Sequence, residues 1–219
     1  MYTLTLDRSS QLPSLAVFKS ADVVLSHSWQ GAQNGGTWLA EARALLTDAG
    51  IALTSIDRFV CGTGPGSFSG IRACLAAVNG LVLPSDARAY GVASAAAIAA
   101  AQNASLVTVV GDARRNRLWC VTYQIAEGRL RLANTGGMPT HTADDFQLVP
   151  TSDLARAIPT EALVVSPDWE RLAPVLESTA TRLIKAAAFP SAEVIGKLAL
   201  AEPSALRPEP SPIYLHPAV

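Results

Sequence analysis

Apolar and polar residues alternate in three short runs near the start of the chain, and short polar segments separate the runs. Alternation with a period of two is typical of strands that bury one face. We therefore expect an antiparallel meander at the start of a sheet, formed by residues 2–7, 15–18 and 23–29.

The spacing of apolar residues then changes to that of a helix. After a glycine-rich break at residues 31–36, the segment 37–49 places four apolar side chains on one face: Trp38, Ala42, Leu45 and Leu46. The pattern next predicts a strand, a long helix that ends before Pro84, a second strand and a short helix, at residues 58–61, 69–83, 89–92 and 94–101.

From residue 105 the order begins again with a strand meander and continues into a looser α/β region. We expect strands at 106–110, 118–125, 129–132 and 163–165, helices at 168–177 and 191–200, and irregular structure over 136–159. This duplication predicts two α/β lobes, residues 1–104 and 105–219, of which the second is abbreviated.

The helix expected at residues 69–83 is apolar on every face. A core stripe is followed by small residues on the other faces, namely Ala73, Ala76, Ala77 and Gly80, and only Arg72 and Asn79 are polar across its middle. A helix that is apolar all round is buried on both sides. Two explanations stay open: burial under the second lobe, or packing against a helix of another subunit, which small residues allow to approach closely.

The most unusual segment is C-G-T-G-P-G-S-F-S-G-I-R, residues 61–72, between an expected strand and this helix. It matches neither the Rossmann nor the P-loop template, because Ser67 stands where the former needs glycine and no lysine follows. It is either a tight turn whose Ser67 or Ser69 caps the helix, or a loop that faces an anionic ligand.

Composition excludes several classes of protein. A net charge of −1 with only three lysines gives no electrostatic footprint for independent nucleic-acid binding, and Arg114, Arg115 and Arg117 form the one basic cluster. Three cysteines without ligand spacing suit a reducing cytosol, and the apolar run at 92–101 is too short to span a bilayer. We expect a cytoplasmic protein without a membrane partner.

Catalytic constellations are missing from the sequence. The three histidines, His27, His141 and His216, are scattered, and no metal-binding or nucleophile motif occurs. Asp7 and Asp112 are the best placed carboxylates, because each ends an expected strand, where side chains often face a cleft.

Several motifs resemble those of the TsaB (YeaZ) family. The run from Gly64 to Arg72, G-P-G-S-F-S-G-I-R, resembles the family signature G-P-G-S-F-T-G-L-R, and Asp112-Ala113-Arg114-Arg115 resembles its D-A-R-R/M segment. Residues 4–9 are similar to the opening I-x-D-T-S, and residues 212–215 to the terminal P-x-Y-L-R. The order and spacing fit over nearly the whole chain.

The resemblance implies the two-lobed fold of sugar kinases, Hsp70 and actin, with ribonuclease H-like lobes. It also implies a non-catalytic bacterial subunit for threonylcarbamoyladenosine formation on tRNAs that read ANN codons. TsaB-like proteins bind the catalytic subunit TsaD through helices of the first lobe, are joined by the ATPase TsaE, contact tRNA indirectly, and form homodimers through the same surface.

Carried over onto this sequence, the resemblance places the partner interface at Trp38, Ala42, Leu45, Ile71, Arg72, Ala73, Ala76, Ala77 and Gly80. The motif loop is Gly64, Pro65, Gly66, Phe68 and Gly70, with Phe68 expected between strand and helix. Asp7, Ser67, Ser69 and Asp112 are candidates for a nucleotide site, and Arg114 and Arg115 for contact with tRNA or TsaE. No resident cofactor is expected, although ATP or ADP could sit at an interface of the complex.

The sequence departs from the family pattern at several positions. Arg8 replaces a threonine in the first phosphate-type turn, where a bulky cation would hinder a nucleotide phosphate. Residues 35–37 stand where relatives show His-Ser, His216 replaces a terminal arginine, and Gly136-Gly137 is too early for an adenosine motif.

Our leading hypothesis is therefore a scaffold that docks TsaD. Two rivals stay open: an enzyme of the same fold, either an ATP-dependent phosphotransferase or a glycoprotease-like peptidase, and a stand-alone homodimeric ligand-binding module. The sequence does not decide between a homodimer and a heterodimer.

Overall fold

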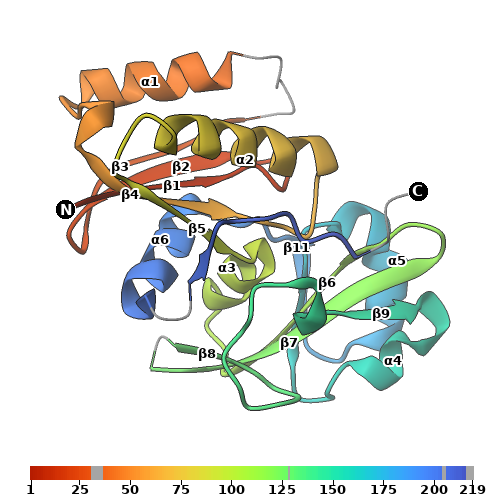
Figure 1. The fold of residues 1–219 in the computed structure, drawn as a ribbon. Helices are drawn as coiled ribbons and strands as arrows, with labels where there is room; N and C mark the ends of the chain where they lie inside the picture. Colours follow the sequence, from red (N-terminus) through yellow and green to blue (C-terminus); the bar gives the residue numbers. More distant parts are fainter. Residues whose placement is uncertain (31–36, 128, 204–205, 216–219) are drawn as a thin grey trace.

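The meander predicted at the start of the chain forms one edge of a six-stranded sheet, with strand order β12-β5-β4-β1-β2-β3 (Figure 1). The computed structural model describes residues 1–30, 37–127, 129–203 and 206–215. β1 pairs antiparallel with β2 and parallel with β4, and β4 pairs parallel with β5. The strands of this sheet in the first half of the chain are β1 (Tyr2–Asp7), β2 (Ser14–Lys19), β3 (Asp22–Ser28), β4 (Ile56–Gly62) and β5 (Arg88–Val92).

Helices cover both faces of this first sheet. α1 (Trp38–Asp48) and α2 (Phe68–Val82) lie together on the outer face, away from the rest of the molecule (Figure 1). α3 (Ser94–Ala100) and α6 (Ala192–Ala201) lie on the inner face, between the two lobes. The first six residues of α3 are fully buried, so its run of alanines suits a helix enclosed on all sides.

A second six-stranded sheet builds the other lobe, which confirms the predicted two-lobed α/β fold. Its strand order is β11-β10-β6-β7-β8, and β9 pairs with β7. The elements are β6 (Leu106–Asp112), β7 (Arg117–Ala126), β8 (Arg129–Leu132), β9 (Gln147–Pro150), β10 (Leu163–Ser166) and β11 (Leu183–Ala187), with α4 (Leu154–Ala157) and α5 (Trp169–Thr179).

One expectation for this lobe was wrong, and one strand was missed. The segment expected to be irregular contains β9, α4 and 3-10 turns, and β11 was not predicted. β9 has only four residues and is fixed by pairing with β7, which lies far away in sequence. β11 is an exposed edge strand with no alternation of buried and exposed positions, so no pattern marks it.

The lobe boundary expected at residue 104 separates the two sheets, but the end of the chain returns to the first lobe. Thr5 Oγ1 donates a hydrogen bond of 2.7 Å to the carbonyl oxygen of Ala192, at the start of α6. β12 (Arg207–Pro208) then pairs with β5. Helix α6 therefore packs on the first sheet and β12 joins it, so both belong to the first lobe rather than to the second.

The second lobe does not cover α2, so that explanation for its apolar character was wrong. The side of α2 that faces the sheet buries Ile71, Cys74, Leu75 and Val78. The opposite side is exposed along Arg72, Ala76, Asn79 and Gly80. Within the described chain, this outer side of α2, with the small residues Ala76 and Gly80 at its centre, has no cover.

A buried carboxylate joins three segments beneath the glycine loop. Asp7, at the end of β1, accepts hydrogen bonds from Ser9 N and Ser9 Oγ, both at 2.8 Å, and from Ser94 Oγ at 2.6 Å. Ser94 Oγ in turn accepts a bond from Gly64 N at 3.0 Å. Burial raises the pKa of Asp7 from 3.8 to about 6, against the lowering effect of these hydrogen bonds.

A histidine links the same region to the second lobe. His141 is buried, and its Nδ1 accepts a hydrogen bond of 3.2 Å from the N–H of Ala93, which precedes α3. The backbone N–H of His141 donates to the carboxylate of Asp145, and Arg207 donates to the carbonyl oxygen of His141. Burial lowers the pKa of His141, and Asp145 acts in the opposite direction.

We predict that Gly62→Ala destabilises the protein strongly, because the new Cβ would lie 1.8 Å from Asp7 Oδ2. That oxygen is held by Ser94, so the strain should lower the free energy of unfolding by about 2–3 kcal/mol. The matched control is Gly80→Ala, where a Cβ meets nothing within 4 Å. This control should stabilise the monomer by about 0.5–1 kcal/mol. Urea denaturation gives the free energy of unfolding of both variants. Equal changes in the two would contradict the close contact between Gly62 and Asp7.

We also predict an acid-sensitive contact between the lobes. Because the folded pKa of His141 lies below its ordinary value of 6.5, its contribution to stability is complete above about pH 6.5 and is lost as the pH falls through the folded pKa. The raised pKa of Asp7 has the opposite effect, because it stabilises the folded state as the pH falls below about 6. This effect should be the same in the wild type and in any His141 variant. Urea unfolding at pH 7.5 and 5.0 should therefore show a larger loss of stability for the wild type than for His141→Gln. Equal losses would exclude this contact as the cause.

Candidate functional site

The glycine loop is a tight turn built against the end of β1. Ser67 N donates to the carbonyl oxygen of Ser9 at 2.7 Å, and Ser67 Oγ accepts from Gly70 N at 3.3 Å, so Ser67 rather than Ser69 caps α2. A Cβ on Gly70 would lie 1.9 Å from the carbonyl oxygen of Arg8. Glycine is therefore required here for close packing of backbone on backbone.

Three N–H groups of this loop, those of Gly64, Ser67 and Gly70, already have acceptors inside the protein. A loop that cradles a phosphate leaves such groups free for its ligand. Of the two functions left open by the sequence, the geometry favours the turn that positions α2.

Phe68 does not pack between strand and helix as expected. Its side chain is 57% exposed and stacks on Tyr214, with ring centroids 5.3 Å apart. The guanidinium carbon of Arg72 lies 4.8 Å from the centroid of the same ring. Because the core beneath the loop is already filled by Ile71, the aromatic ring at the first position of α2 points outward.

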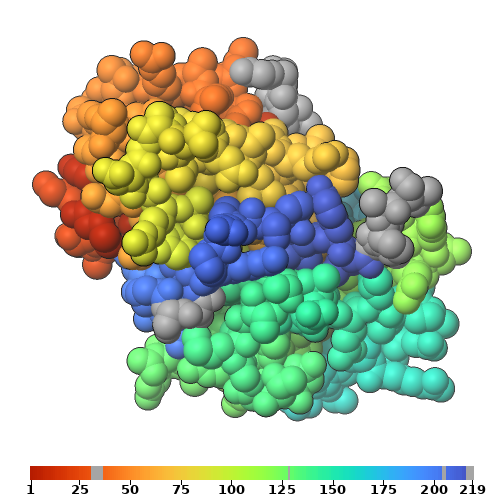
Figure 2. All heavy atoms as spheres, in the orientation of Figure 1, coloured from red at the N-terminus to blue at the C-terminus, as the bar shows by residue number. Residues whose placement is uncertain are grey.

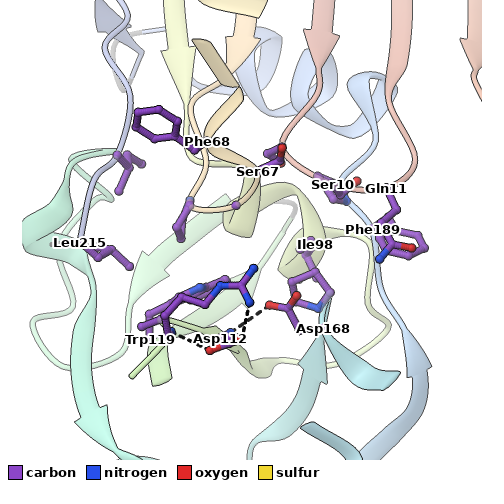
Figure 3. Close-up of a pocket in the computed structure, with 18 of the residues that line it drawn as sticks. Ser10, Gln11, Ser67, Phe68, Ile98, Asp112, Trp119, Asp168, Phe189 and Leu215 are labelled. Carbon is purple, nitrogen blue, oxygen red and sulfur yellow. Dashed lines mark hydrogen bonds and ion pairs between the residues drawn. The ribbon is translucent and has the colours of Figure 1, made fainter. Parts of the chain in front are cut away.

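A cleft of about 890 Å³ opens between the lobes at this loop. Figure 3 shows Ser67 and Phe68 on its first-lobe side, and Asp112, Trp119 and Asp168 on the opposite side. Ser69 and Arg72 also line the cleft. Asp7 does not line it, because that carboxylate is enclosed beneath the loop.

Asp112 is placed in the cleft as expected, but its carboxylate is already engaged. It accepts a hydrogen bond from the N–H of Arg114 at 2.7 Å and forms an ion pair with Arg171, while its own N–H donates to Asp168 (Figure 3). Burial acts to raise the pKa of Asp112, but the bonds from Arg114 and Arg171 hold it below its ordinary value. The carboxylate is therefore ionised and held in place by its neighbours.

The two arginines proposed for contact with tRNA or TsaE lie in an exposed turn. Arg114 is at the edge of the cleft, 3.7 Å from Asp112, and Arg115 points to solvent beside it. Arg117, the third member of the basic cluster, donates to the carbonyl oxygen of Leu148. The proposed role of Arg114 and Arg115 stays a prediction.

Only part of the predicted partner interface is at the surface. Trp38, Ala42 and Ile71 belong to the core between α1, α2 and the sheet, so they support the face from beneath and cannot make its contacts. Leu45, Ala73 and Ala77 are half-buried, and Arg72, Ala76 and Gly80 are exposed. The structure also exposes three large apolar side chains that the predicted interface does not include, Leu39, Leu83 and Tyr214, of which Leu83 is 88% exposed.

Leu83 follows Ala76 by seven residues, so helical spacing alone could have added it to the face. No such signal exists for Tyr214, because it reaches Phe68 from the other end of the chain. The face is therefore an outer stripe of α2 that begins beside the C-terminal segment.

Arg8 does not occupy the cleft, contrary to the expectation that it would obstruct a phosphate there. Its guanidinium carbon lies 4.5 Å from the ring centroid of Trp38, beneath α1. The side chain is buried, which lowers its pKa, and its Nε and Nη1 atoms lack partners in the described chain. The departures at Gly35, Gly36 and His216 lie outside the described residues.

Metal sites and membrane spans are both absent from the described residues. They contain no group of three or more His, Cys, Asp or Glu side chains placed to hold a metal ion. No helix among them has the length and apolar character needed to cross a membrane.

A family model and known proteins resemble this chain over part of its length. Residues 38–138 match the family model described as TsaD, tRNA N6-adenosine threonylcarbamoyltransferase. The chain is 27% identical to the tRNA threonylcarbamoyladenosine biosynthesis protein TsaB of Escherichia coli (strain K12) over 128 residues. That match covers 57% of this chain and 55% of the relative, so it spans about half the length of that protein.

Solved structures match over almost the whole chain. YeaZ from Pseudomonas aeruginosa superimposes with a TM-score of 0.79 at 24% identity, covering 97% of this chain and 100% of that protein. A further structure, described as an uncharacterized protein with similarity to peptidase YeaZ from Pseudomonas aeruginosa, gives a TM-score of 0.79 at 25% identity, covering 98% and 99%. The TsaB match and the TsaD family model support a TsaB/YeaZ family assignment, and the YeaZ structures share the fold of this chain.

Proposed function

We propose that this chain is a non-catalytic subunit in the formation of threonylcarbamoyladenosine on tRNA, and that it docks a TsaD-type catalytic subunit through the outer face of α2. The observation that carries the proposal is the exposed small-residue stripe of this helix. The relative named for threonylcarbamoyladenosine biosynthesis supports the pathway.

The shape of this outer face suits a second helix. Ala76 and Gly80 form a low centre, and a Cβ on Gly80 would meet nothing within 4 Å. Arg72 and Leu83 stand at the two ends. Small residues at a crossing point let two helix axes approach closely, and the bulkier ends then pack beside the partner helix.

The family comparison indicates which helix could lie there. The match to the TsaD family covers residues 38–138, which include both α1 and α2. A TsaD-type subunit therefore has a counterpart of this helix pair. Two chains with the same surface patch can pair about an approximate two-fold axis, as in isologous dimers. A second copy of this chain could use the same geometry, so a homodimer is the competing state.

TsaE is the second partner that we propose, by resemblance alone. Contact with tRNA or TsaE is proposed at Arg114 and Arg115, which are exposed, with Arg114 at the edge of the cleft. The subunit itself needs no resident cofactor in this proposal, and any ATP or ADP would be held where the complex completes the cleft.

The rival enzymatic function receives less support from the geometry. A phosphotransferase of this fold would use a free carboxylate in the cleft, whereas Asp7 is enclosed and Asp112 is paired with Arg171. Two serines, Ser67 and Ser69, lie between Gly66 and Gly70, and the hydroxyl of Ser67 is engaged as the cap of α2.

Insertion of a charge into the outer face of α2 tests docking. Ala77→Glu is the change that the sequence suggests, but Ala77 is half-buried against the core, so Ala76→Glu is the cleaner variant. An unpaired carboxylate buried at the interface should weaken binding to TsaD by about 100-fold or more. Ala155→Glu, at an exposed alanine of α4 in the second lobe, is the matched control.

Isothermal titration with purified TsaD gives the affinities, and thermal melting confirms that each variant is folded. If Ala76→Glu binds TsaD as tightly as the control does, the docking face is wrongly placed.

Binding of ATP to the isolated chain separates the scaffold from the phosphotransferase. Calorimetric titration of the isolated chain with ATP and magnesium should give no binding at micromolar affinity, because the cleft carboxylate is already paired. Micromolar binding that is lost in Asp112→Asn would favour the enzymatic function instead.

A further inference from the structure

The C-terminal segment, residues 209–215, lies along the junction of the two lobes (Figure 2, blue). It is anchored there by a hydrogen bond of 2.9 Å from Ile213 N to the carbonyl oxygen of Thr63, and Ile213 itself is buried. The next residue, Tyr214, leaves the anchored position and stacks on Phe68, the first residue of α2.

This stack exposes two aromatic rings at the surface. Phe68 is 57% exposed and Tyr214 is 41% exposed, with the rings inclined by 30°. Exposed aromatic groups that lie together are typical of surfaces that bind another molecule. Since neither ring is needed to fill the core, their position calls for a functional explanation.

Arg72 adds a cation to the two rings. Its guanidinium lies on the Phe68 ring, and no ion pair or hydrogen bond engages it within the described chain. By contrast, Arg114 and Arg171, the other arginines that line the cleft, are both paired with Asp112. Arg72 is thus the cation of this region that remains ready for an external carboxylate.

Spacing places this cation on the docking face. Phe68, Arg72 and Ala76 follow one another at intervals of four residues, so they lie along one stripe of α2. The stripe is continuous with Ala76 and Gly80, and the stack of Phe68 on Tyr214 forms its N-terminal end.

We propose that Arg72, held on the ring of Phe68, binds a carboxylate side chain of the docked TsaD-type subunit, and that Tyr214 positions it by fixing Phe68. The C-terminal segment is then part of the docking surface. A guanidinium that is already stacked loses little conformational freedom on pairing, and its planar fork matches a carboxylate. The inference rests on the proposed function.

The test measures affinity for TsaD at 50 and 300 mM NaCl, for the whole chain of residues 1–219 and its variants. Arg72→Met should weaken binding about tenfold at low salt and reduce the salt dependence, because one desolvated charge pair is lost. Arg72→Lys keeps the charge but loses the planar fork, so it should restore only part of the affinity. Arg156→Met, at an exposed arginine of α4, is the control and should bind as the wild type does.

Tyr214 is tested as a positioning residue. Tyr214→Ala should weaken binding and reduce the salt dependence in the same direction as Arg72→Met, whereas Tyr214→Phe keeps the ring and should match the wild type. In the double variant Arg72→Met/Tyr214→Ala, the loss of binding free energy should be smaller than the sum of the losses in the two single variants, since Tyr214 acts through Arg72.

The outcomes separate this inference from the proposed function. If the wild type does not bind TsaD, both are overturned. If it binds and Arg72→Met retains its affinity and salt dependence, only the present inference is overturned. If Tyr214→Ala lowers the melting temperature but leaves affinity unchanged, the C-terminal segment is structural and not part of the docking surface. If Arg72→Met instead abolishes binding of inorganic phosphate without affecting TsaD, the cation serves the cleft and the inference fails.

Discussion

A single buried carboxylate, that of Asp7, fixes how the first strand, the glycine loop and α3 meet. A carboxylate enclosed in protein is strongly destabilising unless donors surround it. Ser9 and Ser94 supply those donors, and Ser94 also accepts a bond from Gly64, so the loop is tied to the same group. The raised pKa of Asp7, about 6, records the burial that these bonds offset.

The surroundings of Asp7 determine the rest of the loop. Gly62 must lack a side chain because Asp7 occupies that space, and Gly70 must lack one because the backbone of Arg8 lies against it. With these contacts in place, Ser67 caps α2 and its inner residues enter the core. The glycines that first suggest a phosphate site are therefore explained by close packing around an internal anion.

Much of this architecture was predictable from the sequence, because it is local. The meander, α1, α2 and the first strands follow from periodicity and from helix ends marked by serine, glycine and proline. What could not be predicted depends on contacts between distant residues. α6 joins the first sheet through Thr5 and Ser14, almost the whole chain away, and the stack of Phe68 on Tyr214 is likewise non-local. Trp38 and Ala42 were correctly placed on one face of α1, but periodicity alone does not say whether that face meets the core or a partner.

The two alanine-rich helices show why composition alone leaves that question open. α3 and α2 both lack charged residues over most of their length, and the same rule predicts cover on all sides for both. The fold satisfies the rule for α3, which is enclosed between the lobes, but for α2 it covers only the side of Ile71 and Cys74. On a permanently solvated helix the position of Ala76 would accept lysine or glutamate without loss of packing. Alanine is also a good helix former on a solvated surface, so Ala76 alone does not decide the matter, and the cover of this outer side by a second pair of helices stays a proposal.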